Sequence, residues 1–240
     1  MLNYFTKYKQ QQIALQKQNL LLTQELEWAH VFHDSIKGKP WLENLSLNIG
    51  RWAGSYSFFY ILHRILQDYK PNSILEMGLG ESTKFISTYL QNYLTTTSHF
   101  IVEHDVNWAN TFVEKFNLTS HSTILHCALE QKEVNGFTTN SYGNLQNQIN
   151  SKFELYIIDG PFGSDRYSRY DMFNLAQTLV PSDEFIILFD DTHRKGEEDT
   201  INAIIHLLEQ KQIPVFVQSY EGVKKSTIVA TSKYKFATSF

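Results

Sequence analysis

This 240-residue sequence contains a single cysteine, so an internal disulfide bond and a zinc site with several cysteine ligands are excluded. We expect that thiol, Cys127, to be buried and inert. The sequence also lacks an excess of basic charge: 21 Lys and Arg against 25 Asp and Glu give a formal net charge of −4. Bulk electrostatics therefore do not favour nucleic acid or an anionic membrane as a partner.

No apolar run reaches membrane-spanning length, and the start MLNYFTKYKQQQ lacks the basic-then-apolar order of a signal peptide. We therefore expect a cytoplasmic protein without a membrane span. The hydrophobic share of 42% and the charged share of 19% are ordinary for a globular protein, and the length suits one full-sized domain with an appendage.

The appendage is expected over residues 1–40, ahead of a domain over residues 41–240. Residues Tyr8–His33 are rich in Gln and free of Gly and Pro, which favours a helix. Leu15, Leu22 and Ala29 recur every seven residues as a short heptad stripe. Such a stripe is typical of a helix that forms a homodimer or docks on a partner, or of a helix packed on its own domain. We prefer the second interpretation.

After a helix expected over about residues 55–68, short apolar runs alternate with helical stretches. This alternation predicts an α/β, Rossmann-like fold with a mostly parallel seven-stranded sheet and helices on both faces. The last two strands are expected to form a C-terminal antiparallel hairpin, and residues 135–150 a polar loop with a helical turn. The expected strands are Ser73–Met77, His99–Val102, Thr123–Cys127, Leu155–Ile158, Phe185–Phe189, Val215–Gln218 and Thr227–Ala230.

The strongest local signal is Ile74–Gly80 (ILEMGLG), an apolar strand that runs into a Gly-x-Gly turn ahead of a helix. Gly78 and Gly80 carry no side chains that would block a ligand, so a cofactor can lie against the main chain there. Thr83 stands where a dinucleotide-binding G-x-G-x-x-G has its third glycine, so the loop is not that motif. Taken alone, the turn also fits an ordinary strand-to-helix connection.

Acidic residues follow three further predicted strands. Glu103 lies 23 residues beyond Gly80, where a carboxylate can accept the hydroxyls of a ribose; the alternative is a solvated acid. Asp159 and the pair Asp190-Asp191 should converge in one crevice, where a cation, a proton or an arginine must relieve their repulsion. Oxygen ligands suit Mg²⁺ or another divalent cation. Alternatively, Asp159 faces the cofactor and the pair caps the following helix.

The Glu76, Gly78 and Gly80 pattern resembles the E-x-G-x-G first motif of class I S-adenosylmethionine (SAM)-dependent methyltransferases. The resemblance implies SAM as cofactor, with the acid helping to hold its methionine moiety and the segment after the third strand lying at the adenine edge. The cofactor-binding residues that it implies are Glu76, Gly78, Gly80, Ser82, Thr83, Glu103, His104, Ala128, Leu129 and Asp159.

Two groups of O-methyltransferases are similar over roughly residues 55–232. Asp159 with Asp190 and Asp191 resembles the metal triad of the macrocin- and novobiocin-type sugar enzymes, whereas IVEHDVNW, IIDGPFGSDRYSR and FDDTHR resemble the glucuronoxylan 4-O-methyltransferase group. Both imply methylation of a sugar hydroxyl of a surface polysaccharide or a glycan precursor. Two departures stand out: Pro161 replaces the acid that acts as base in the first group, and Asp190 replaces a His of the second.

The expected catalytic residues are His193, Asp159 and Asp191. His193 is the candidate general base because an imidazole accepts a proton near neutral pH, and His104 competes for that role. Arg166, Arg169 and Arg194 flank the expected site and can grip an anionic group of the acceptor or balance the acids. Other interpretations are methyl or aminopropyl transfer to another small molecule, and a non-catalytic scaffold subunit of a glycan-assembly complex.

Overall fold

The computed structural model describes residues 2–50 and 52–240 and confirms the predicted fold class. Its main sheet has the strand order β3-β2-β1-β6-β7-β9-β8, in which the first five strands are parallel. The last two strands form an antiparallel hairpin, as predicted. The strands are β1 (Ser73–Met77), β2 (Ser98–Glu103), β3 (Ser122–His126), β6 (Leu155–Ile158), β7 (Ile186–Phe189), β8 (Val215–Glu221) and β9 (Lys225–Thr231).

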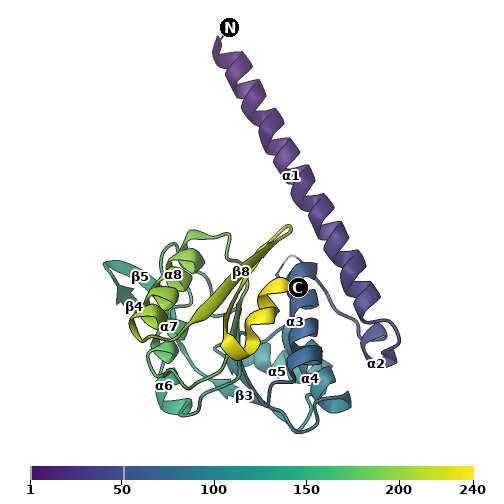
Figure 1. The fold of residues 1–240 in the computed structure, drawn as a ribbon, viewed down its shortest axis with the longest axis vertical. Helices are drawn as coiled ribbons and strands as arrows, with labels where there is room; N and C mark the ends of the chain where they lie inside the picture. The colour runs from purple at the N-terminus through teal and green to yellow at the C-terminus, as the bar shows by residue number, and fades with distance from the viewer. Residues whose placement is uncertain (1, 51) are drawn as a thin grey trace.

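Helices cover both faces of this sheet because the central strands are apolar on both sides (Figure 1). In β6, Leu155 and Ile157 join one hydrophobic cluster, while Tyr156 and Ile158 join the other. The first cluster includes α3 (Tyr56–Arg64), α4 (Glu81–Asn92) and η2 (Ser232–Ser239). The second includes α6 (Leu145–Gln148), α7 (Asp171–Ala176) and α8 (Lys195–Gln210), and α5 (Val106–Lys115) packs on a smaller third cluster.

The prediction of a loop over residues 135–150 is wrong for the first half of this segment. Strands β4 (Leu129–Val134) and β5 (Phe137–Tyr142) form a separate two-stranded hairpin, followed by the helical turn α6. The hairpin turns at Asn135-Gly136, both with positive φ, and Asn-Gly is a strong turn signal. Because β4 is largely exposed, its sequence shows no apolar alternation that would have predicted a strand.

The expected second helix is interrupted near its end: α3 gives way to the π-helical turn η1 (Ile65–Tyr69). Its start agrees with the prediction, because Ser55 caps α3 by accepting a hydrogen bond from the backbone N–H of Phe58.

Helix α1 (Leu2–Ser35) projects from the body of the protein, and only its C-terminal end lies against it (Figure 1). Phe32 is buried in the first cluster, and the Trp28 indole donates a hydrogen bond to the Glu221 carbonyl. Residues 6–20 are exposed, and Leu15 and Leu22 keep 51% and 48% of their surface accessible. The preferred interpretation, packing on the same chain, therefore holds for the end of α1. Dimerisation or docking stays a prediction.

Short α2 (Pro40–Glu43) follows the turn after α1. None of the helices in the described part of the chain combines the length and the apolar character needed to cross a membrane.

A buried histidine joins α1, α3 and α4. His63 is 2% exposed; its Nδ1 lies 2.5 Å from the Tyr89 hydroxyl and its Nε2 lies 3.1 Å from the Ser35 carbonyl oxygen. Burial, followed by the positive charge of Lys39, lowers the pKa of His63 from 6.5 to about 4. The folded protein therefore keeps this imidazole neutral.

Acid should destabilise the protein through His63. Between pH 6.5 and pH 4 the unfolded chain binds a proton that the folded chain does not, so the free energy of unfolding falls as pH falls through this window. Between pH 7.5 and pH 5, wild type should lose about 2 kcal/mol more than His63→Gln, as measured by urea unfolding. The control is His206→Gln, at an exposed histidine, which should lose as much stability as wild type. Equal losses of stability in wild type and His63→Gln would contradict the role of His63.

Candidate functional site

A cavity of about 610 Å³ opens where β1, β2 and β6 end at their carboxyl edge, a size suited to a small-molecule ligand. Three loops supply most of its wall, Gly78–Ser82 after β1, Glu103–Asp105 after β2 and Asp159–Gly163 after β6. The remaining lining residues are Asn48, Trp52, Ala53, Gly54, Trp108, Tyr142, Arg169, Asp191, Arg194 and Lys224.

The two glycines of the first loop have different structural roles. Gly78 has φ +102°, and a Cβ there would lie 3.1 Å from the Gly160 nitrogen, so only glycine lets the loops after β1 and β6 touch. Gly80 has an extended backbone, and a Cβ there would meet no described atom within 4 Å. Gly80 therefore leaves bare backbone at the cavity wall without being required for packing.

Glu76 lies beneath this loop and outside the cavity lining. Its fully buried carboxylate accepts hydrogen bonds from the hydroxyls of Ser82 at 2.5 Å and Thr83 at 2.8 Å, and His99 Nε2 lies 3.0 Å away. Thr83 also accepts from the Gly80 backbone N–H at 3.0 Å. This network orders the loop from below. Of the residues expected here to bind cofactor, Ser82 lines the cavity, while direct contacts by Glu76 and Thr83 stay a prediction.

Glu103 connects the end of β2 to the glycine loop. Its Oε2 accepts the Leu79 backbone N–H at 3.1 Å, and its Oε1 accepts the backbone N–H groups of His104 and Asp105 at 2.7 and 2.8 Å. The Trp108 indole completes the link by donating to the Leu79 carbonyl at 2.8 Å. The Glu103 carboxylate is thus held in a fixed orientation at the cavity wall.

The buried guanidinium of Arg169 holds the acidic residues together. It donates to the carboxylates of Asp159 and Asp191, each at 3.1 Å, and to the backbone carbonyls of Ile158 and Asp190 at 3.2 and 2.9 Å. Arg169 therefore supplies the positive charge that was expected to relieve the repulsion between these carboxylates. Both Arg169 and Asp191 have positive φ, at 59° and 60°.

Lys224 adds a second buried cation from the turn between β8 and β9. Its Nζ lies 3.3 Å from Asp190 Oδ2 and 3.2 Å from Asp191 Oδ1. Burial lowers the pKa of Lys224, but Asp190, Asp191 and Asp159 outweigh burial and raise it above the ordinary value. The ammonium therefore stays charged.

The pKa values of Asp159 and Asp191 shift in opposite directions, although the cations act to lower both. Burial raises the pKa of Asp159 to about 7, although Arg169 acts to lower it. Burial also acts to raise the pKa of Asp191, but Arg169, Lys224 and Arg194 hold it below its ordinary value. Asp191 is consequently a fixed anion, whereas Asp159 can exchange a proton near neutral pH.

The predicted metal triad comes together, but it is not free for a metal. Oxygen atoms of Asp159, Asp190 and Asp191 lie within 4.8 Å of one another. All three carboxylates, however, already contact Arg169 or Lys224. A divalent cation needs directly coordinated oxygens and would have to displace the Lys224 ammonium, so the cluster does not fit a metal as it stands. The predicted capping alternative is not observed either, because no side chain caps α8.

Several other predicted residues lie apart from the cavity lining. His193 is exposed beside the cluster, Arg166 pairs with Asp199, and Ala128 and Leu129 are exposed near the base of the β4–β5 hairpin. Arg194 and His104 do line the cavity, and Arg194 lies 3.0 Å from Asp191.

Tyr142, Lys224 and Trp52 line the cavity but were not predicted from the sequence. The buried Tyr142 hydroxyl has no hydrogen-bond partner among the described residues, and burial raises its pKa, so it remains a donor. Trp52 is 95% exposed at the cavity wall. An Asn-Gly turn ahead of Tyr142 was the one available signal for its strand.

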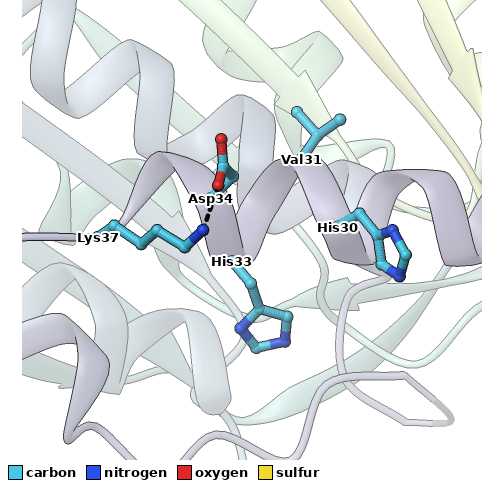
Figure 2. A pocket seen from close by; sticks show the side chains of 5 residues that line it. All are labelled: His30, Val31, His33, Asp34 and Lys37. Carbon is cyan, nitrogen blue, oxygen red and sulfur yellow. Dashed lines mark hydrogen bonds and ion pairs between the residues drawn. The ribbon is translucent and has the colours of Figure 1, made fainter.

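A second hollow lies on α1, away from this site. Figure 2 shows its five lining residues, with Asp34 directed toward Lys37 at 2.5 Å and not toward the two imidazole rings. Among the described residues, only Asp159, Asp190 and Asp191 lie close enough together to hold a metal ion. The His and Asp side chains of this hollow therefore do not form a metal site.

No protein-family model and no curated protein matches this sequence. Solved structures do match. The O-methyltransferase TomG from Streptomyces achromogenes, involved in tomaymycin synthesis and solved in complex with SAM, has a TM-score of 0.55 at 9% identity, covering 90% of this chain and 99% of TomG. This chain has the fold of a methyltransferase.

A second match to this methyltransferase fold is a Klebsiella pneumoniae protein assigned as an O-methyltransferase. Its TM-score is 0.51 at 11% identity, and the alignment covers 89% of this chain and 95% of that protein. Identities this low concern the fold, so the sugar-specific resemblances stay predictions.

Replacing Arg169 should destabilise the fold. Arg169→Met leaves the carboxylates of Asp159 and Asp191 buried without their common partner, and we expect a loss of roughly 3–5 kcal/mol in the free energy of unfolding. Arg166→Met removes the same charge from a side chain that is one-third exposed and leaves Asp199 paired with Lys195 at 2.9 Å, so it should cost much less stability. Chemical denaturation measures both; a stable Arg169→Met protein would contradict this role.

Proposed function

We propose that the protein is a SAM-dependent O-methyltransferase. The observation that carries the proposal is the convergence of the glycine loop and Glu103 at one cavity, where Leu79 N lies 3.1 Å from Glu103 Oε2. In this proposal, the bare backbone at Gly80 lets the cofactor lie against the main chain, and Glu103 accepts its ribose hydroxyls. The methyltransferase fold supports this assignment.

The reaction is transfer of a methyl group to a hydroxyl oxygen. SAM supplies a sulfonium methyl group; the carbon–sulfur bond breaks with its electron pair going to sulfur as the new carbon–oxygen bond forms. The protein then has two tasks, to align the acceptor and to remove its proton. No step in this proposal passes through a metal ion.

We propose Asp159 as the group that takes this proton. Arg169 fixes its Oδ1, while no described residue donates a hydrogen bond to Oδ2. A pKa of about 7 suits a general base at neutral pH. His193 is exposed outside the cavity lining, and His104 Nδ1 lies 3.0 Å from Glu103. Both histidines are therefore less suited to the role.

A sugar hydroxyl is the acceptor that we propose, from a surface polysaccharide or a glycan precursor. The family resemblance supports this choice, and so does Trp52, whose exposed ring at the cavity wall can pack against the apolar C–H face of a sugar. Arg194, half exposed and at the same wall, is suited to an anionic group on such an acceptor.

Cofactor binding can be tested at Gly80. Added side chains should block the cavity without disturbing the fold, so Gly80→Ala and Gly80→Val should lower SAM affinity in that order, by at least about tenfold for Val. Isothermal titration calorimetry measures the affinity, and thermal unfolding checks that both variants fold like wild type. Wild-type protein that does not bind SAM would favour the scaffold interpretation, and unchanged affinity in a folded Gly80→Val would contradict the loop's role.

The base can be tested by comparing two candidates. Asp159→Asn should lower kcat by about 100-fold or more because a neutral amide cannot take the proton, while SAM affinity stays within a few-fold of wild type. His193→Ala should retain nearly full turnover. The readout is formation of S-adenosylhomocysteine with a panel of glycan acceptors. The reverse pattern, with loss only in His193→Ala, would restore His193 as the base.

A further inference from the structure

Lys224 reaches the acidic cluster from a part of the chain far from it in sequence. It lies in the β8–β9 turn, its side chain is 11% exposed, and it lines the cavity. Its ammonium contacts both Asp190 and Asp191, at 3.3 and 3.2 Å. These are two of the three carboxylates that a bound metal ion would bridge.

Other contacts within the protein occupy further oxygen atoms of the cluster, while Asp191 Oδ1 is buried and is reached only by the Lys224 ammonium among the described residues. Ser226 donates to Asp190 Oδ1 at 3.1 Å, and Arg169 donates to Asp159 and Asp191. The three carboxylates thus face Arg169 and the nearly buried Lys224, with Arg194 at the rim on Asp191, and the fully buried Glu197 lies 3.7 Å from both arginines. A hard divalent cation instead requires several oxygens at about 2.0–2.6 Å that are free of competing donors.

Both sides of the turn hold Lys224 in place. On the outer side, Glu25 of α1 accepts the Val223 backbone N–H at 3.1 Å and the Tyr56 backbone N–H at 2.8 Å. On the inner side, the Lys225 carbonyl accepts the backbone N–H of Thr192, which directly follows Asp191, at 2.8 Å. The backbone on both flanks of Lys224 is therefore anchored, and the ion pairs with Asp190 and Asp191 hold its ammonium.

We propose that Lys224 is the resident cation of the Asp159-Asp190-Asp191 cluster and occupies the place of a divalent metal ion. The cluster is then complete without a metal, and removal of the ammonium converts it into a metal site. The proposal concerns the charge of the cluster and does not rest on the proposed methyl transfer, so metal binding tests it independently of turnover.

The test is titration of the full chain with Mn²⁺ alone, followed by electron paramagnetic resonance and calorimetry. Wild type should bind no stoichiometric Mn²⁺. Lys224→Ala should bind one Mn²⁺ with an affinity at least about tenfold above the weak, non-stoichiometric binding of wild type, and Lys224→Ala combined with Asp190→Asn should lose this site. Lys225→Ala is the matched control, because it removes the adjacent lysine charge outside the cluster, and it should behave like wild type.

Two outcomes would overturn the proposal. One is a wild-type protein that binds one Mn²⁺ and loses it on Asp190→Asn, because the ammonium would then yield to the metal. The other is a Lys224→Ala variant with wild-type thermal unfolding that gains no Mn²⁺ affinity. If Lys224→Ala does not fold, Lys224→Met, which keeps the length of the side chain and removes its charge, takes its place in the titration, with the same two outcomes.

Discussion

The buried ion pairing around Arg169 is the interaction on which the rest of the site depends. Parallel strands β6 and β7 end side by side, so Asp159 and Asp191 are brought together at an apolar edge where their charges repel. The guanidinium donates through Nη2 to one oxygen of each carboxylate and through Nη1 to the carbonyls at the two strand ends. This network also holds Arg169 and Asp191 in left-handed backbone conformations, which cost free energy for residues other than glycine.

This network divides the cavity into two chemically different halves. The half formed by the glycine loop and Glu103 is organised by backbone hydrogen bonds and presents bare main chain with one oriented carboxylate. The other half contains several charges in close contact. Their environments differ enough that the pKa of Asp159 is raised to about 7, whereas the pKa of Asp191 is lowered. Two carboxylates with opposed pKa shifts are a common basis for separate acid–base and anchoring roles.

The sequence predicted those parts of the site that follow from local pattern. A strand, its terminal acid and the next turn are contiguous, so the glycine loop, Glu103 and Asp159 could be found from short segments. Lys224 could not, because it is one of two adjacent lysines and only the register of the β8–β9 hairpin brings it to the acids. The β4–β5 hairpin that carries Tyr142 was not predicted because β4 is polar and exposed. Glu76 matched a cofactor motif, but its partners Ser82, Thr83 and His99 bury it beneath the loop.

Helix α1 is connected to this chemistry more directly than its projecting shape suggests. Its outer part has no packing on the described domain, but Glu25 and Trp28 bind backbone groups of Val223, in the β8–β9 turn, and Glu221, at the end of β8. That turn carries Lys224 into the acidic cluster, so α1 contacts the segment that supplies this cation. Coulomb energy in a partly buried site changes steeply with distance, so the position of this turn matters for the ion pairs of Lys224. The contact of Glu25 with Val223, the residue before Lys224, therefore links the seating of α1 to the charged half of the cavity.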